Sequence, residues 1–422
     1  MDTLLPMRAI RLGLMALLAG AVLSAAEAPG SLKALLAEAL TNNPEILASQ
    51  KRYEAARQRP SQVSSLPDPM FSPGFASNGR PWPGAGLGKE PTSNIGFMVS
   101  QEVPWPGKRK LQGDMAVKEY EAEFQNYAQA QLSVVSRIKQ AYYRRAYAFD
   151  VVEVLDRNID LLRRMLKITE ARYAVGKAAQ QDVFKAQTQI SILSTKRIQL
   201  EREKRAREAE IVSLLNRAPG SPLERPDVLA PLEMKIGLEE LYASARQNSP
   251  MLLKDEKMMQ RAELAVNMAR KEYYPDYTIK AGYFNMGSMP PMYQLSADFK
   301  IPLYFFRKQR QAVTEQSQTL AATRRDYEAS SQSLLFRIKD DQLMAETSNQ
   351  LIKLYSQTVI PQSSLALEAS LSSYETGTVD FLTVLMNYVT VVEYEMNYEE
   401  ELQNYYLAVS RLEEMTGRSL LP

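Results

Sequence analysis

The longest uninterrupted helical signal in the chain sets its overall form. From Asp114 to Val175, 62 consecutive residues lack glycine and proline, and after Gly176 another 41 follow, from Lys177 to Arg217. Glycine and proline are the residues that most often end helices, and 62 helical residues extend about 90 Å at 1.5 Å per residue. We therefore expect helices far longer than those of an ordinary globular domain.

The second half of the chain carries the same signal. It begins at Leu303, is interrupted at Pro361, turns at Gly377 and continues to Thr416. Apolar residues in these runs alternate spacings of four and three, which is typical of a coiled-coil seam; an example is Leu155, Ile159, Leu162 and Leu166. The sequence predicts two antiparallel helical hairpins with tips at Gly176 and Gly377, and a kink or local opening at Pro361.

An internal repeat divides the chain. Leu32, Leu35, Ala39, Asn42 and Pro44 recur 206 positions later as Leu238, Leu241, Ala245, Asn248 and Pro250. We assign a first repeat to residues 27–217, with its hairpin at 108–217, and a second to residues 237–422, with its hairpin at 303–416. Residues 218–236 contain prolines 219, 222, 226 and 231, and are interpreted as a linker.

The N-terminus has the pattern of a secretory signal peptide over residues 1–26. Arg8 and Arg11 precede an uncharged apolar stretch that ends in small residues, which predicts cleavage after Ala26 or Ala28. A retained N-terminal anchor is the alternative. No later segment approaches the roughly 20 apolar residues of a membrane-spanning helix.

Four strands are expected, at about 70–77, 94–102, 277–284 and 293–301. In the last of these the odd positions are apolar, whereas Gln294, Ser296, Asp298 and Lys300 form a polar face. Strands of nine or ten residues with this alternation are typical of a transmembrane β-barrel, with the polar face toward the lumen. A soluble hairpin packed on the helices alternates in the same way. Residues 78–93 and 285–291 are expected to be connecting loops.

Strand number limits what one chain can do in a membrane. The edges of a four-stranded sheet leave backbone groups that lipid cannot satisfy, and barrels begin at about eight strands. If these strands span a membrane, several chains must share one barrel, and their helical hairpins must continue it as a second tube.

Composition excludes several classes of function. The chain has no cysteine and no histidine, which removes thiol nucleophiles, imidazole metal sites and histidine-dependent triads. Its net charge of +2 is spread along the chain, so no nucleic-acid partner is expected. A hydrolase with paired carboxylates would need a convergent pocket that heptad helices do not indicate. We expect no enzyme activity, no cofactor and no metal site.

With the repeat, the strands and the hairpins described, the chain resembles the TolC-like outer-membrane efflux proteins, or outer membrane factors. The resemblance covers the mature length and is carried by residues 101–108 (QEVPWPGK), by residues 360–362 (IPQ), and by the two tips at 173–176 (YAVG) and 374–377 (YETG). It implies a trimer with a shared twelve-stranded barrel in the outer membrane and a helical tunnel through the periplasm.

The resemblance also implies a function and partners. Such a trimer is a passive exit duct of a tripartite efflux or secretion system, joined through a periplasmic adaptor to an inner-membrane pump. The alternative is a soluble periplasmic coiled-coil scaffold or adaptor. The residues expected to contact the adaptor are Val175, Gly176, Lys177, Thr376, Gly377 and Thr378. Both glycines also suit a plain turn between two helices.

The periplasmic aperture departs from the family's best-known pattern. The positions six and nine residues after the second tip glycine, acidic in that pattern, are Thr383 and Met386 here. Asp182, six residues after Gly176, matches the acidic position of the first repeat, and Asp380 lies close to the other one. We therefore list Asp182, Asp380, Phe381 and Thr383 as candidate aperture residues, with a helix cap as the alternative role for the two acids.

A basic cluster follows each predicted strand pair. Lys108, Arg109 and Lys110 form the first, and Arg307, Lys308 and Arg310 the second. If the strands cross a membrane, these clusters lie where the helices leave it, and we expect them to reach lipid phosphates. A solvated periplasmic face is the alternative.

Overall fold

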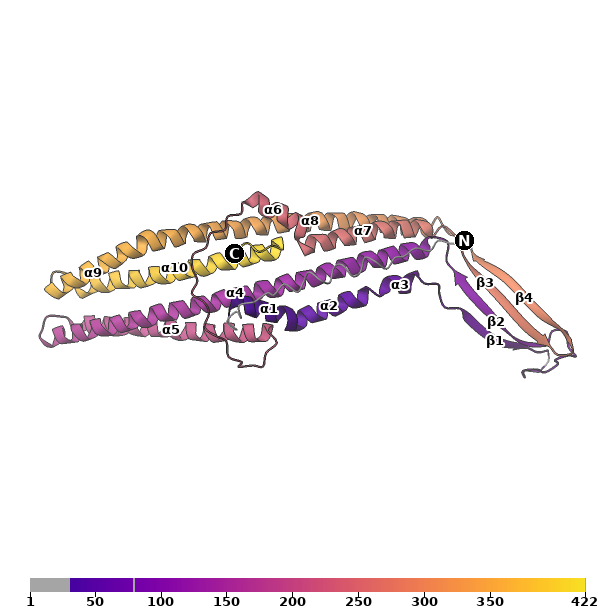
Figure 1. The fold of residues 1–422 in the computed structure, drawn as a ribbon, viewed down its shortest axis with the longest axis horizontal. Helices are drawn as coiled ribbons and strands as arrows, with labels where there is room; N and C mark the ends of the chain where they lie inside the picture. Colours follow the sequence, from indigo (N-terminus) through magenta and orange to yellow (C-terminus); the bar gives the residue numbers. More distant parts are fainter. Residues whose placement is uncertain (1–30, 79, 422) are drawn as a thin grey trace, which may run out of the picture.

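The computed structural model describes residues 31–78 and 80–421 and is a long, narrow molecule with the helices in one body and the strands at one end (Figure 1). The predicted signal peptide, residues 1–26, lies outside the described residues. Within the described ranges, no helix is both long and apolar enough to cross a membrane.

The two halves of the chain run through a similar order of elements. The first contains α1 (Leu32–Asn42), α2 (Pro44–Ala56), α3 (Arg59–Ser64), β1 (Met70–Ala76), β2 (Asn94–Val103), α4 (Lys108–Ala174) and α5 (Gln180–Leu214). The second contains α6 (Leu238–Asn248), α7 (Pro250–Lys271), β3 (Asp276–Met286), β4 (Met289–Lys300), α8 (Gln309–Leu354), a π-helical turn (Tyr355–Val359), α9 (Ile360–Thr376) and α10 (Phe381–Thr416). The predicted fold class, mainly helical with long hairpins and four strands, is confirmed.

Helix α4 is the axis of the molecule. Its 67 residues run from the sheet to the far end, about 100 Å at the usual rise. It packs along α5 and α10 toward the tips, and along α2, α3 and α7 toward the sheet. In the second half, α7 and α10 both pack against α8, while α9 packs against α10.

The second long helix opens as predicted at its proline. Pro361 has no N–H to donate to the carbonyl of Gln357, so a regular α-helix would leave that carbonyl unpaired. The chain forms the π-helical turn Tyr355–Val359 directly before this point and then resumes as α9. Helix α4 has no proline and stays continuous.

The strands form one open antiparallel sheet in the order β1-β2-β3-β4. Its central pair joins the two halves of the chain, with Val99 opposite Ala281. The loop expected at residues 285–291 is wrong, because β3 continues to Met286 and β4 begins at Met289 around a two-residue turn. Gly287 takes a φ of 73° there. Pro290 and Pro291 are tolerated because they lie at the start of β4, beside the irregularity in its pairing with β3.

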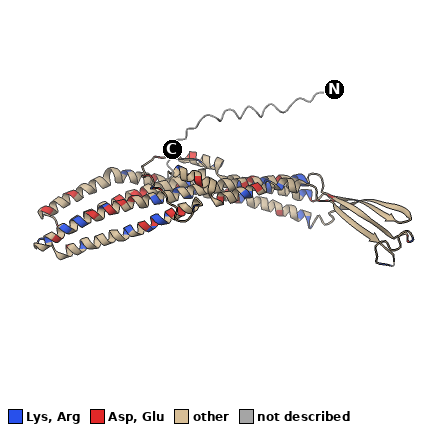
Figure 2. Ribbon diagram, turned by 60° about the horizontal axis from the view of Figure 1, so that its bottom comes forward, with Lys and Arg blue, Asp and Glu red and all other residues tan. Residues whose placement is uncertain are grey.

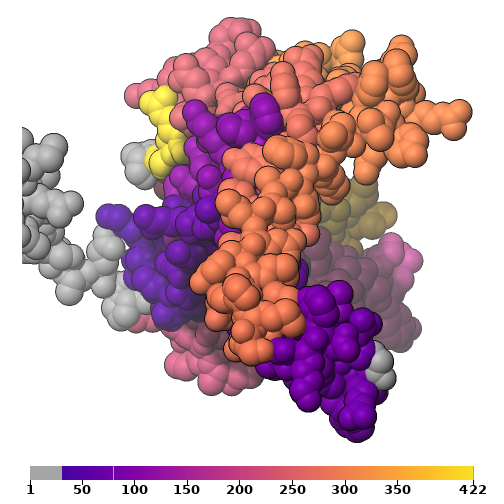
Figure 3. Space-filling view, turned by 90° about the vertical axis from the view of Figure 1, so that its right-hand side faces the viewer, coloured from indigo at the N-terminus to yellow at the C-terminus, as the bar shows by residue number. Residues whose placement is uncertain are grey.

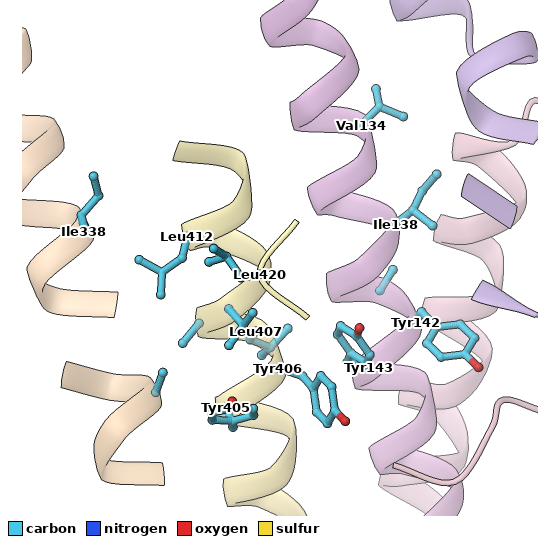
Figure 4. Packing of buried hydrophobic residues seen from close by; sticks show 14 of the residues in the cluster. Val134, Ile138, Tyr142, Tyr143, Ile338, Tyr405, Tyr406, Leu407, Leu412 and Leu420 are labelled. Carbon is cyan, nitrogen blue, oxygen red and sulfur yellow. The ribbon is translucent and has the colours of Figure 1, made fainter. Parts of the chain in front are cut away.

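Two hydrophobic clusters hold the helices together. One lies at the middle of the helical body and combines α1, α4, α6, α8 and α10; Figure 4 shows its aromatic centre, where the rings of Tyr143 and Tyr406 are 4.5 Å apart. The other lies toward the tips, between α4, α5, α9 and α10, and includes Leu155, Leu162 and Tyr388. The predicted seam of α4 therefore faces the second cluster.

The proline-rich segment between α5 and α6 is fixed to the body by tyrosine hydroxyls. Tyr142 accepts from the backbone N–H of Asp227 at 2.8 Å, Tyr405 accepts from that of Met234 at 2.8 Å, and Tyr406 donates to the carbonyl of Ala230 at 2.6 Å. These bonds stabilise an irregular segment that has no ladder of its own.

Candidate functional site

The tips of the two hairpins lie together at the end of the molecule opposite the sheet (Figure 1). In the first tip, Gly176 has a φ of 72°, which a side chain would disfavour, and the N–H of Lys177 donates to the carbonyl of Arg172 at 2.8 Å. Val175 is 68% exposed, and nothing lies within 4 Å of the position that a β-carbon on Gly176 would take. The first tip is a tight turn with an open surface.

The second tip has the same form. Gly377 has a φ of 82°, and the N–H of Thr378 donates to the carbonyl of Ser373 at 3.0 Å. Thr376 and Thr378 are exposed, with their hydroxyl oxygens 3.3 Å apart. The sequence-predicted contact residues therefore gather on two adjacent turns with exposed backbone.

One arginine joins the two tips. Nη1 of Arg172, near the end of α4, donates to the carbonyl oxygen of Tyr374 on α9 at 2.5 Å. The carbon of the same guanidinium lies 4.4 Å from the centre of the Tyr374 ring. Tyr374 is itself buried and packs edge-on against Phe381, with ring centroids 5.9 Å apart. Arg172 thus holds one hairpin against the other within a single chain.

The candidate aperture residues divide into caps and core. Asp182 accepts from the backbone N–H of Ala179 at 3.3 Å, and Asp380 caps α10 by accepting from the backbone N–H of Thr383 at 3.2 Å. Asp380 and Thr383 are exposed, and Asp182 is half-buried. The hydrogen bond from the Thr383 hydroxyl holds the pKa of Asp380 below its usual value. Asp380 therefore stays ionised at neutral pH.

Phe381 does not lie where the sequence suggested. Its side chain is only 2% exposed and belongs to the hydrophobic cluster of the tip half, against Tyr374. The first residue of α10 turns inward because the capping Asp380 already occupies the solvent side. Phe381 consequently fastens the tip internally and cannot project into an aperture in this conformation.

The two faces of the sheet differ in chemistry. Rings from all four strands follow one another across one face: Phe71, Phe97, Tyr283 and Tyr293, with neighbouring centroids 5.4 to 6.0 Å apart. The other face carries the predicted polar residues of β4, namely Gln294, Ser296, Asp298 and Lys300, and an ion pair between Lys280 and Asp298. The sheet is therefore apolar on one side and hydrogen-bonding on the other.

The two basic clusters differ in how far their side chains are buried. The Lys108 side chain is 3% exposed, and its Nζ lies 2.9 Å from both carboxylate oxygens of Asp276 and 3.2 Å from the carbonyl of Tyr274. The expectation that Lys108 reaches lipid is wrong, because this ion pair uses it to join α4 to β3. Arg307, Lys308 and Arg310 are exposed.

Sequence reasoning missed Arg172, Tyr374 and Lys108 as positioning residues. Arg172 and Tyr374 are 202 positions apart in the chain, and Lys108 is 164 positions from Glu272, the nearest of its partners in sequence. The only sequence signal was the presence of Tyr at the same distance before each tip glycine.

The profile of the family described as "Outer membrane efflux protein" matches residues 35–217 and 241–418. The chain belongs to the outer membrane efflux protein family. One relative is the pyoverdine export outer membrane protein OpmQ of Pseudomonas aeruginosa, 25% identical over 308 residues, which are 69% of this chain and 63% of OpmQ. The matched part therefore spans less than two thirds of that relative.

A second relative is matched over nearly its whole length. The outer membrane protein TolC of Vibrio cholerae is 23% identical over 398 residues, covering 90% of this chain and 89% of TolC. Among solved structures, the outer membrane protein VceC of Vibrio cholerae aligns with a TM-score of 0.78 at 16% identity, over 92% of this chain and 96% of VceC. This efflux protein shares their fold, and its family places it in the outer membrane, with the helices on the periplasmic side.

Proposed function

We propose that three copies of the chain form a passive exit duct for a tripartite efflux or secretion system. The observation that carries this proposal is the open four-stranded sheet with an aromatic face, attached to helices about 100 Å long. Strands β1 and β4 are both edges, and an edge in lipid leaves N–H and C=O groups without partners. Three sheets joined edge to edge give twelve strands and no free edge.

The cargo path follows the chemistry of the sheet. A barrel in a membrane presents its apolar face to lipid and its polar face to the channel. We assign the aromatic row to the lipid side and Gln294, Ser296, Asp298 and Lys300 to the lumen. Their mixed donors and acceptors, with Lys280 and Asp298 paired, supply a hydrated lining without a strong charge of one sign. A duct of this kind leaves the choice of cargo to the pump, and we assign it no catalytic role.

The tips are the proposed contact with the periplasmic adaptor. Gly176 and Gly377 have no side chain, so a partner can approach the backbone closely, and the exposed Val175, Lys177, Thr376 and Thr378 surround them. Asp182, Asp380 and Thr383 lie one helical turn or less inside the tips and are the proposed rim of the entrance. Phe381 is not part of that rim.

The test is the mass of the protein extracted by detergent from purified outer membranes, measured by light scattering with the bound detergent subtracted. We expect three times the mass of the processed chain, and stepwise conductance when the same sample is added to a planar bilayer. A water-soluble monomer would instead support the periplasmic scaffold, and a trimer without conductance would reject the duct while keeping the assembly.

A further inference from the structure

An exposed apolar turn separates β4 from α8. In residues 301–306 (IPLYFF), Leu303 is 72% exposed, Tyr304 80% and Phe306 66%. The turn is held by its own backbone, since the N–H groups of Arg307 and Lys308 both donate to the carbonyl of Tyr304, at 3.1 and 2.9 Å. Large side chains are thus displayed on a defined turn, and Figure 3 shows the chain after β4 standing out from the side of the molecule.

The turn continues an existing apolar surface. Tyr293, Leu295 and Phe299 lie on the aromatic face of β4, and Ile301 and Leu303 extend the same alternation beyond the last strand residue. We assigned that face to lipid, so the turn lies where the membrane ends and the helices begin. The inference therefore rests on the proposed placement of the sheet.

Three cations follow the apolar turn directly. Arg307, Lys308 and Arg310 are exposed, and none of the described acidic residues forms an ion pair with them. They precede or begin α8, where the helix dipole disfavours positive charge, so helix stability does not explain them. Figure 2 shows basic residues where the helices meet the strands.

The corresponding turn of the first repeat is built inward. Trp105 stacks on Tyr274, with ring centroids 5.3 Å apart, its N–H donates to Asp276 at 2.7 Å, and Lys108 is buried against the same carboxylate. Of the first basic cluster, Lys110 alone stays exposed. The second junction differs because it presents an exposed apolar turn followed by three exposed cations.

We propose that residues 301–310 are a lipid anchor of the periplasmic leaflet: Leu303, Tyr304 and Phe306 enter the interface, and Arg307, Lys308 and Arg310 bind the phosphates of anionic lipids. The order apolar, aromatic, cationic matches the order of chemical environments on leaving a bilayer. Each cation near an anionic surface contributes about a fivefold preference. The anchor sets the depth of the trimer in the membrane.

The absence of native cysteine makes depth measurable in the full-length trimer. A fluorophore is attached at Tyr304→Cys or, as a control, at Leu354→Cys, which is 49% exposed in the helical body, and the protein is reconstituted in phosphatidylcholine vesicles with phosphatidylglycerol. We expect nitroxide lipids to quench position 304 and not 354. Quenching of 304 by aqueous iodide alone would overturn the proposal in favour of solvent. Protection from both quenchers would overturn it in favour of a neighbouring subunit.

The cations are tested separately. The variant Arg307→Gln/Lys308→Gln/Arg310→Gln is compared with Arg164→Gln/Lys167→Gln/Arg202→Gln, which removes the same charge from exposed positions of α4 and α5. Native mass spectrometry counts the phosphatidylglycerol retained by each trimer. We expect at least a fivefold loss for the first variant only. Equal retention by both variants would refute the phosphate contacts, whereas a failure of either protein to form trimers would bear on the proposed duct and not on the anchor.

Discussion

The contact between Arg172 and Tyr374 predicts that one substitution separates the two tips. In Arg172→Met the side chain keeps its length but loses both the hydrogen bond to the Tyr374 carbonyl and the cation–π contact. A charge-assisted hydrogen bond contributes about 1.5–3 kcal/mol and a cation–π contact about 0.5–2 kcal/mol. Because Arg172 is only half-buried and its Nε has no partner, we expect a loss of about 2–3 kcal/mol.

That loss corresponds to about a 30- to 150-fold rise in the open population of the tips. Amide hydrogen exchange of the trimer, followed by mass spectrometry, reports it in peptides that cover residues 170–182 and 372–383. We expect faster exchange in both peptides and unchanged exchange at the middle of the body. Arg163→Met is the matched control, because Arg163 forms only an exposed pair with Asp160 on the same helix.

Unchanged protection of both tip peptides in Arg172→Met would refute the reasoning, because the link would then contribute no free energy. Faster exchange in the first tip alone would also contradict it, since the contact is shared between hairpins. Arg172→Lys keeps the charge but not the planar fork, and we expect an intermediate rate.

Three further predictions concern other parts of the molecule. Gly176→Glu costs about 1–2 kcal/mol of backbone strain on an open turn, so we expect trimers to form while export in cells is lost. The control is Gly220→Glu, which is equally strained and equally open but lies in the linker, and we expect cells with this variant to export normally. Equal export with both variants would refute the assignment of the tip to adaptor contact. Tyr406→Phe loses the bond to Ala230 and should lower the free energy of unfolding in denaturant by about 1 kcal/mol, whereas Tyr273→Phe, exposed at the surface, should not. Burial raises the pKa of Asp150 to about 6 and that of Glu399 to about 7. Neighbouring carboxylates act in the same direction, since Glu153 raises the pKa of Asp150, and Asp150 raises the pKa of Glu399. Because the folded state holds these protons more tightly than the unfolded state, the free energy of unfolding should fall as pH rises from about 4 to about 7. The melting temperature should therefore be higher at about pH 5 than at about pH 8, and Glu399→Gln should reduce that difference. A pH dependence of the melting temperature that the substitution leaves unchanged would contradict the raised pKa of Glu399.

Much of the architecture could be predicted from the sequence because it depends on the conformational preferences of residues close together in the chain. Helix length follows from the spacing of glycine and proline, the coiled-coil seam from apolar periodicity, and the opening before Pro361 from the missing N–H. The alternation in β4 predicted a sheet with two different faces, and Gly176 and Gly377 predicted the turns. The repeat was visible because the same local pattern occurs twice.

The tertiary structure alone decided which side chains meet. Arg172 contacts Tyr374, which is 202 residues away in the chain. Lys108 is buried in an ion pair with Asp276, and the side chain of Phe381 lies in the core. Periodicity places a residue on a face of its helix, but the partner of that face depends on how distant elements pack. The two junctions with the sheet look alike in sequence and differ in the structure because their long-range partners differ.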